Sequence, residues 1–350
     1  MKKIISGIQQ VGIGVPIVYE AFNWYKERFG MSIPLFDDKG TAELMLPYTN
    51  NQPQNRHAIL ALNLKGGGGF EIWQYTTRTP LAADFRVEPG DLGIFFCKIK
   101  CDDVKETYKE LRDANVELLN EPQEAPDGSL HFFLRDPYGN LFEVMENISF
   151  FGKGTHRTGG AAGVGIGVSD MTTSIEFYSK VLGYDKTLYD KTGTFEDLAS
   201  LEGGGKTFRR VLLTHSDQRK GPFSRLLGSS HIELFEAHHF DARKIYANRQ
   251  WGDLGFIHIC FDVKNMEVIK SDCEAKGHPF RVDSGSRDFD MGEAAGHFAY
   301  IEDPDGVLIE LVETFRIPVI KKLGWYLNLK KRNPEKALPD WLLKLLKYVG

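Results

Sequence analysis

Two stretches of the sequence repeat one chemical pattern, a turn followed by an apolar run that carries a glutamate. One stretch runs from Asp136 to Glu143 and the other from Asp303 to Glu310. Asp-Pro-x-Gly favours a type I turn, because proline presets the backbone angle at the second position and glycine tolerates the fourth. A carboxylate inside an apolar run is costly unless it is paired or bound to a metal ion. The repeat therefore predicts the architecture, and the glutamates indicate the chemistry.

Two further glutamates, Glu71 and Glu233, lie in similar apolar runs. Because side chains alternate between the two faces of a strand, Glu71, Trp73 and Tyr75 would share one face. If Glu71 borders a cavity, Trp73 and Tyr75 are candidates for its walls.

A strand followed by a helix precedes each glutamate, so the chain divides into four similar modules. Residues 8–30 show this pattern, and residues 92–115, 161–183 and 254–277 repeat it, with Asp103 and Asn265 as expected helix caps. The modules run over residues 7–78, 91–147, 160–238 and 252–315. We therefore expect two fused domains, residues 7–147 and 160–315, and a C-terminal extension over residues 316–350.

A strand–helix–three-strand unit in four tandem copies, with a glutamate in each last strand and Asp-Pro-x-Gly turns, resembles the vicinal oxygen chelate superfamily. This group includes glyoxalase I, extradiol dioxygenases, methylmalonyl-CoA epimerase, and fosfomycin and bleomycin resistance proteins. The resemblance covers residues 7–315. It implies an α+β fold in which βαβββ modules pair into two cup-shaped half-barrels.

The resemblance also implies metal-ligand positions, since each module of this family offers up to two ligands, one on its first strand and one on its last. The first-strand positions here hold Gln10, Phe96, Gly163 and His258. The last-strand positions hold Glu71, Glu143, Glu233 and Glu310. Phenylalanine and glycine side chains cannot bind a metal ion, so the pairing of modules decides which site is complete.

Three pairings are open. Modules 1 and 2 would combine Gln10, Glu71 and Glu143, and modules 3 and 4 would combine Glu233, His258 and Glu310. Modules 1 and 4 would combine Gln10, Glu71, His258 and Glu310.

The pairing of modules 1 and 4 matches the ligand pattern of glyoxalase I, and tandem-fused glyoxalases are similar in pairing 1 with 4 and 2 with 3. We therefore expect this set, with a second site left incomplete at Phe96 and Gly163. The alternative is a site in the second half, where His231 shares a face with Glu233.

The local sequence both supports and limits the resemblance to glyoxalase I. Residues 255–259, Gly-Phe-Ile-His-Ile, resemble its Gly-Phe-x-His-Ile stretch. Glyoxalase I has arginines four residues after the glutamine and four residues before the histidine, and these hold the glutathione carboxylate. Gly14 and Leu254 stand at those positions here. This departure argues against a glutathione-dependent lyase in the strict sense.

One amide, two carboxylates and one imidazole suit a divalent ion such as Zn, Ni, Co, Mn or Fe. An ion with open positions can bind two neighbouring substrate oxygens and stabilise an enediolate. The resemblance implies that Glu310 takes the α-proton and that Glu71 is its counterpart. His297 is a candidate hydrogen-bond donor to a ligand, and an ordinary strand-edge histidine is the alternative.

The expected function is therefore that of a metal-dependent isomerase or lyase of the glyoxalase or epimerase type, acting on a small oxygenated substrate. An Fe(II) ring-cleaving dioxygenase is an alternative, although such enzymes need two histidines and one carboxylate, and Gly163 occupies the position of the first histidine. A second alternative is a binding protein that kept the cup and lost the metal.

Composition and charge argue against a nucleic-acid-binding protein or a membrane-spanning protein. The 350 residues are 42% hydrophobic and carry a net charge of −5, so nothing favours nucleic-acid binding. The four cysteines lack zinc-site spacing, which is typical of reduced thiols in a cytoplasmic protein. No stretch is long and apolar enough to span a membrane. We expect a monomer or a homodimer.

The extension differs in charge from the rest of the chain, with nine basic and two acidic residues between 316 and 350. Trp341, Leu342, Leu345 and Tyr348 would lie on one face of a helix that begins near Asp340. We expect this helix to pack on the body of the protein, and contact with an anionic membrane surface is the alternative.

Overall fold

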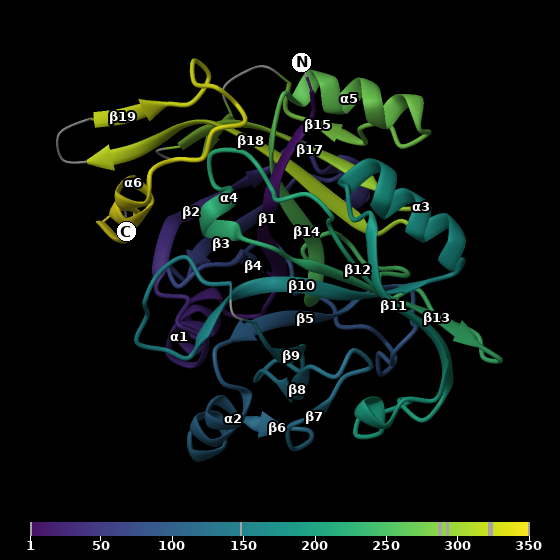
Figure 1. The fold of residues 1–350 in the computed structure, drawn as a ribbon. Coiled ribbons are helices and arrows are strands. Elements are labelled where there is room, and N and C mark those ends of the chain that lie inside the picture. Colours follow the sequence, from purple (N-terminus) through teal and green to yellow (C-terminus); the bar gives the residue numbers. More distant parts are fainter. Residues whose placement is uncertain (1, 148, 286–288, 292–293, 321–324, 349–350) are drawn as a thin grey trace.

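The computed structural model describes residues 2–147, 149–285, 289–291, 294–320 and 325–348. Two strongly curved sheets form the molecule, with the longer helices on their outer sides (Figure 1). This is the α+β arrangement of two half-barrels that the family resemblance implies.

Each sheet combines one module from the first half of the chain with one from the second half. The first sheet joins modules 1 and 4, because β1 pairs antiparallel with β14 at its centre. Its strands, in spatial order, are β15 (Val282–Asp283), β17 (Ala294–Glu302), β18 (Leu308–Ile320), β14 (Gly255–Lys264), β1 (Ile4–Gly14), β4 (Gly69–Tyr75), β3 (Gln54–Leu62) and β2 (Ile33–Ala42). Two further strands, β16 (Phe289–Met291) and β19 (Trp325–Asn328), pair with β17 and β18.

The second sheet joins modules 2 and 3 through an antiparallel pair of β5 and β10. Its strands are, in spatial order, β11 (Lys186–Gly193), β12 (Thr207–Thr214), β13 (His231–His238), β10 (Thr158–Val168), β5 (Gly93–Cys101), β9 (Leu141–Glu146), β8 (Leu130–Arg135) and β6 (Glu117–Leu118). The short β7 (Gln123–Glu124) pairs with β8.

Each module contributes one longer helix, and these are α1 (Val18–Phe29), α2 (Val104–Asp113), α3 (Met171–Leu182) and α5 (Met266–Ala275). The short helices are η1 (Leu46–Tyr48), η2 (Glu196–Leu198), α4 (Ser224–Leu227), α6 (Asp340–Lys344) and η4 (Leu345–Tyr348). One continuous apolar core contains residues of both sheets and of all four longer helices. The candidate site residues lie outside this core, on the concave face of the first sheet.

The aspartates of the repeated turns hold the modules of each half together. Asp136 accepts a hydrogen bond from the Tyr25 hydroxyl of α1 at 2.5 Å, and Asp303 accepts one from the Tyr178 hydroxyl of α3 at 2.8 Å. Each aspartate also accepts backbone N–H groups of its own turn. The repeated motif thus ties module 2 to module 1, and module 4 to module 3.

The extension begins as a continuation of β18 and packs on the body. Leu338, Leu342, Leu343 and Leu346 are buried together with Leu62 and Leu226. The predicted helix face is wrong in part, since Trp341 is 59% exposed and Tyr348 is 66% exposed. The helix turns Leu343 and Leu346 inward instead, because its packing partners lie on that side.

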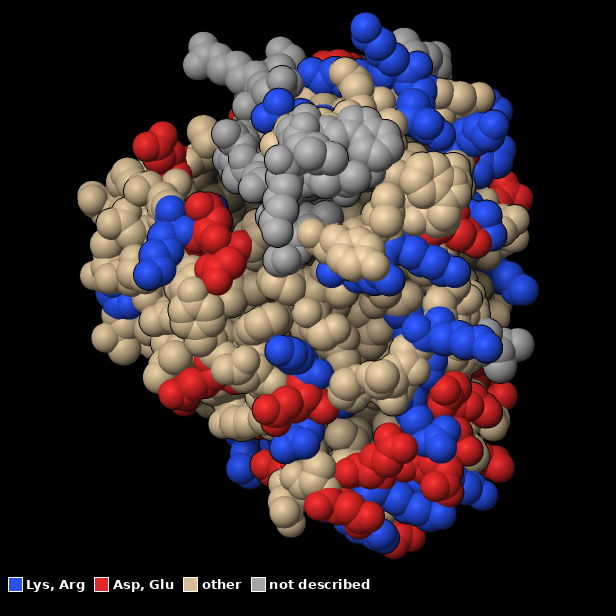
Figure 2. Space-filling model, turned by 90° about the vertical axis from the view of Figure 1, so that its left-hand side faces the viewer, with Lys and Arg blue, Asp and Glu red and all other residues tan. Residues whose placement is uncertain are grey.

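Basic side chains remain on the surface of this region. Figure 2 shows the side on which the extension lies, with lysine and arginine side chains prevailing in its upper part and both signs of charge mixed below. Both acidic residues of the extension pair with the body, Glu335 with Lys220 at 3.1 Å and Asp340 with Arg225 at 2.9 Å. Among the described residues, no helix is long and apolar enough to cross a membrane.

Candidate metal centre

Four adjoining strands bring the expected ligands of modules 1 and 4 to one place on the first sheet. In one row across the strands, Glu71 on β4 lies beside Gly12 on β1, and Gly12 lies beside His258 on β14. The next row contains Gln10 on β1, Cys260 on β14 and Glu310 on β18. Strand pairing therefore brings together residues as far as 300 positions apart in the sequence.

The functional atoms of these side chains converge. His258 Nε2 lies 3.3 Å from a Glu71 oxygen and 3.2 Å from a Glu310 oxygen. The Gln10 amide nitrogen donates to Glu310 at 3.3 Å. Among the described residues, Glu71, His258 and Glu310 form the one group of histidine, cysteine or acidic side chains whose ligand atoms all lie within 4.8 Å of one another.

The donor set fits a divalent metal ion. The Gln10 side-chain oxygen and His258 Nδ1 are buried and make no hydrogen bond with the described residues. Unpaired buried polar atoms are rare in proteins, and a bound ion is one of the features that accounts for them. Burial lowers the pKa of His258, but the Glu310 and Glu71 carboxylates outweigh burial and raise the pKa to about 9. The two carboxylates thus favour a positive charge between them.

Gly12 makes the convergence possible. A Cβ atom at this position would lie 2.4 Å from His258 Cε1, so any side chain would displace the imidazole. Aromatic rings hold the imidazole from other sides, with the Tyr300 ring centred 5.6 Å away and nearly perpendicular, and the Trp251 ring 6.4 Å away and nearly parallel. The histidine is therefore fixed by shape as well as by charge.

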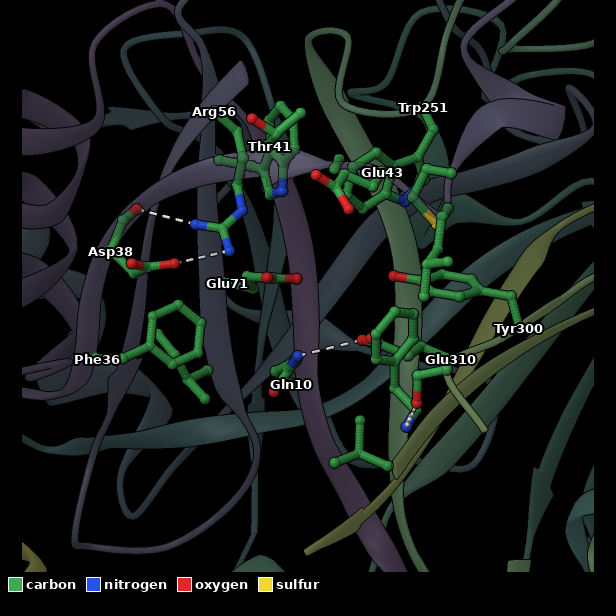
Figure 3. Close-up of a pocket in the computed structure, with 18 of the residues that line it drawn as sticks. Gln10, Phe36, Asp38, Thr41, Glu43, Arg56, Glu71, Trp251, Tyr300 and Glu310 are labelled. Atoms are coloured by element: carbon green, nitrogen blue, oxygen red, sulfur yellow. Dashed lines mark hydrogen bonds and ion pairs between the residues drawn. The ribbon is translucent and has the colours of Figure 1, made fainter. Parts of the chain in front are cut away.

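A cavity of about 350 Å³ opens beside these residues, and Gln10, Glu71 and Glu310 line it. Figure 3 shows the Gln10, Glu71 and Glu310 side chains directed toward one region of the cavity, with the Tyr300 hydroxyl pointing into it. Trp73 and Trp251 line the wall, and their ring centres are 4.6 Å apart. A small substrate in this cavity would contact both carboxylates.

The corresponding place in the second sheet is filled by buried ion pairs. The Lys98 ammonium lies 2.6 Å from Glu233 and also contacts Glu143. Arg210 pairs with Glu233 and, at 2.5 Å, with Asp197. These side chains are at most 4% exposed. The glutamates at this place are therefore already neutralised by protein cations.

Phe96 occupies the place that His258 takes in the first sheet. Gly165 lies beside Glu233 just as Gly12 lies beside Glu71, and a Cβ atom at Gly165 would lie 2.1 Å from the Phe96 ring. Both half-barrels therefore keep the same backbone gap, filled by an imidazole in one and by a phenyl ring in the other.

The alternative ligands in the second half do not form a metal site among the described residues. Glu233 binds Lys98 and Arg210, as described above. His231 belongs to no group of three or more candidate ligands among the described residues, and its pKa is lowered to about 4 by burial and by the Lys98 charge.

Two expected neighbours of the site lie elsewhere. Tyr75 does not line the cavity, because its hydroxyl donates to the backbone carbonyl of Trp251. His297 Nε2 lies 2.6 Å from Asp283, outside the cavity. His297 alternates along β17 with Phe298 and Tyr300, which line the cavity, and so it faces the other side of the sheet.

Sequence reasoning missed several residues of the cavity. Tyr300 lies beside Glu310 in the pairing of β17 with β18, so alternation along β17 was an available signal. Gln9 faces the cavity together with Gln10, because the pairing of β1 with β14 shifts register between Ile8 and Gln10. Trp251 comes from the loop before β14, and no local pattern marks it.

The sequence matches the model of one protein family over two tandem regions. The family is described as the Glyoxalase/Bleomycin resistance protein/Dioxygenase superfamily, and the match covers residues 7–144 and 160–311. The chain belongs to this superfamily. No protein of curated function matches the sequence significantly.

Solved structures of superfamily members share the fold at low sequence identity. Glyoxalase I from Zea mays is 15% identical, with 89% of this chain and 92% of that chain covered and a TM-score of 0.55. A putative dioxygenase from Bacillus subtilis is 13% identical, with 89% and 86% covered and a TM-score of 0.55. These similarities establish a shared superfamily fold, and the chemistry must be argued from the site.

Proposed function

We propose that the protein is a divalent-metal-dependent isomerase or lyase that transfers a proton on a small substrate with two neighbouring oxygens. The observation that carries this proposal is the convergence of Gln10, Glu71, His258 and Glu310 at the edge of a cavity. Zn, Ni, Co, Mn and Fe all accept such a donor set.

A bound ion would hold the two substrate oxygens and lower the energy of the enediolate that forms when a carbon-bound proton leaves. Glu310 is placed to remove that proton, since its carboxylate lines the cavity and is oriented by Gln10 and His258. Glu71 also lines the cavity, with a carboxylate oxygen 3.3 Å from His258 Nε2, and is the second carboxylate that could return the proton to the substrate. Two carboxylates facing one substrate suit proton transfer.

The site favours this reaction over oxidative ring cleavage. The described group contains one imidazole and two carboxylates, whereas the oxygenase pattern has two imidazoles and one carboxylate. His231 and His297, the other candidates for a second imidazole, lie outside the group.

Metal content of matched variants tests the position of the site. We expect the wild type to bind about one divalent ion per chain and Glu71→Gln to lose most of it, because a carboxylate ligand is removed. Glu43→Gln changes another acidic residue of the same cavity and should keep the ion. Metal analysis after dialysis, with circular dichroism to confirm folding, gives the answer.

Retention of the ion by Glu71→Gln, with loss from Glu233→Gln in folded protein, would move the centre to the second half-barrel. A wild type that binds no divalent ion would support the non-catalytic binding protein instead. Hydrogen–deuterium exchange at the α-carbon of a hydroxyketone, followed by NMR, then tests the proton transfer itself. Glu310→Gln should abolish that exchange.

A further inference from the structure

The charges around the cavity are unevenly distributed. Four carboxylates line it, those of Asp38, Glu43, Glu71 and Glu310. Arg56 is the one lysine or arginine among the described lining residues. A substrate with its own negative charge therefore has at most one cationic side chain to bind.

Asp38 forms an ion pair with the Arg56 guanidinium. One guanidinium nitrogen of Arg56 lies 2.8 Å from the Asp38 carboxylate, and another donates to the Asp38 backbone carbonyl at 2.9 Å. Figure 3 shows Asp38 beside the guanidinium at the edge of the cavity. Because Asp38 binds Arg56 at two points, a substrate carboxylate would have to displace a carboxylate that is already in place.

The backbone closes one of the two positions where glyoxalase I has arginines, and an uncharged leucine stands at the other. A Cβ atom at Gly14 would lie 2.0 Å from the Asp253 carbonyl oxygen, so no side chain fits there. Asp253 is held in place by Arg78 at 2.7 Å and is fully buried. At the other position, the Leu254 N–H donates to the carbonyl of Leu81. Arg78 thus pairs with Asp253 in the loop before β14, and it does not line the cavity.

The remaining wall is largely aromatic. Phe36, Trp73, Trp251, Phe298 and Tyr300 line the cavity. Flat apolar surfaces favour a ring or a comparably flat apolar group beside the reacting oxygens.

We infer that the substrate is an uncharged α-hydroxyketone, or a compound with similar neighbouring oxygens, that carries an aryl or other flat apolar group. The inference rests on the proposed function, because it assumes that the oxygens bind at the metal centre. Asp38 acts as the residue that excludes acids, by masking Arg56. Glutathione adducts and other anionic substrates are excluded for the same reason.

Two ligands with one phenyl ring and different charge provide the test. 2-Hydroxyacetophenone is neutral, whereas mandelate has a hydroxyl next to a carboxylate. Calorimetric titration of the full-length, zinc-loaded protein should show tighter binding of the ketone, by about tenfold or more, since Glu71 and Glu310 already balance the charge of the ion and the mandelate carboxylate then meets Asp38, Glu43 and a masked arginine. Mandelate binding equal to or tighter than ketone binding would overturn the inference.

Asp38→Asn tests the masking itself. It should raise the mandelate affinity relative to the ketone affinity by about fivefold, because the guanidinium becomes available to the carboxylate. Glu43→Gln removes one negative charge without releasing Arg56, so it should change the ratio less. An equal change in both variants would contradict the role of Asp38.

The two proposals can fail separately. Protein that retains its ion but binds neither ligand would overturn the substrate class and leave the metal centre in place. Protein without a bound ion would overturn the proposed function first.

Discussion

At the scale of single residues, glycine decides what the strands can hold. Gly12 leaves the space that the His258 ring occupies, and Gly165 leaves the same space for Phe96. Neither glycine has a positive φ, so both are required by close contact and not by backbone conformation. The neighbour that fills the gap then differs, a candidate metal ligand in the first half-barrel and an apolar ring in the second.

A matched pair of alanine variants tests this interpretation. Gly12→Ala places a methyl group 2.4 Å from His258 Cε1, so the ring must turn and the metal affinity should fall by about tenfold or more. Gly165→Ala creates a similar clash with Phe96 and should lower stability by about 1–3 kcal/mol without loss of metal. Zinc titration with a chelator and urea unfolding measure the two effects. Equal metal loss in both variants would contradict the specific role of Gly12.

At the scale of elements, the repeated turns have a structural role that their sequence only hints at. Asp136 and Asp303 accept backbone N–H groups of their own turns and the hydroxyl of a tyrosine on a helix of the preceding module. Burial raises the pKa of Asp303 to about 6, against the hydrogen bonds of Val307 and Tyr178, which favour the charged form. A buried carboxylate that depends on so few donors is sensitive to the loss of one.

Removal of these tyrosine hydroxyls should weaken the contact between modules. We expect Tyr178→Phe to lower the free energy of unfolding by about 1–3 kcal/mol, because a buried acceptor loses a partner. Tyr25→Phe should have a smaller effect, since Asn140 also donates to the same Asp136 oxygen at 2.7 Å. Urea unfolding measures both, with Tyr19→Phe at the exposed Asp37 contact as control. A larger loss for Tyr25→Phe would refute this ranking.

Local capping rules were reliable at one helix and wrong at another. Asp103 caps α2 as expected, accepting the backbone N–H of Glu106. Asn265 precedes α5 but makes no side-chain cap, because its amide donates to the backbone carbonyl of Lys2 from the distant N-terminus. A partner from elsewhere in the chain thus displaced a local interaction.

At the scale of the whole molecule, the two half-barrels share a strand arrangement but differ in the side chains at its centre. The first has candidate metal ligands beside a cavity, and the second has a network of buried ion pairs between modules 2 and 3. His131 belongs to that network, with its ring nitrogens 2.8 Å from Glu143 and 3.4 Å from Asp197. Burial lowers the pKa of His131, but the two carboxylates outweigh burial and raise the pKa to about 9.

This network predicts a pH dependence of stability. The folded-state pKa of His131 is above its ordinary value of 6.5, so its contribution is fully present below pH 6.5 and is lost as the pH rises through 9. The loss should reach about 3 kcal/mol at most, from 1.36 kcal/mol per pKa unit. Urea unfolding between pH 6 and pH 9.5 should show this decline in the wild type and a flatter profile in His131→Gln. Parallel profiles would contradict it.

The sequence by itself determined the repeat, the four modules and the family, because turn residues and strand alternation are local properties. The sequence also indicated Gln10, Glu71, His258 and Glu310 as candidate ligands of one metal ion. Their proximity was decided only by the tertiary structure, since the pairing of β1 with β14 is a contact between the two ends of the repeat.

The content of the cavity depended on the tertiary structure in the same way. Trp251 reaches the wall from a loop, Asp38 neutralises Arg56 from a neighbouring strand, and Lys98 fills the second site from within its own sheet. No local pattern encodes these contacts, because each depends on where distant segments come to lie after folding. The sequence thus determines which residues could be ligands, and the tertiary structure determines which of them lie close enough to bind one ion.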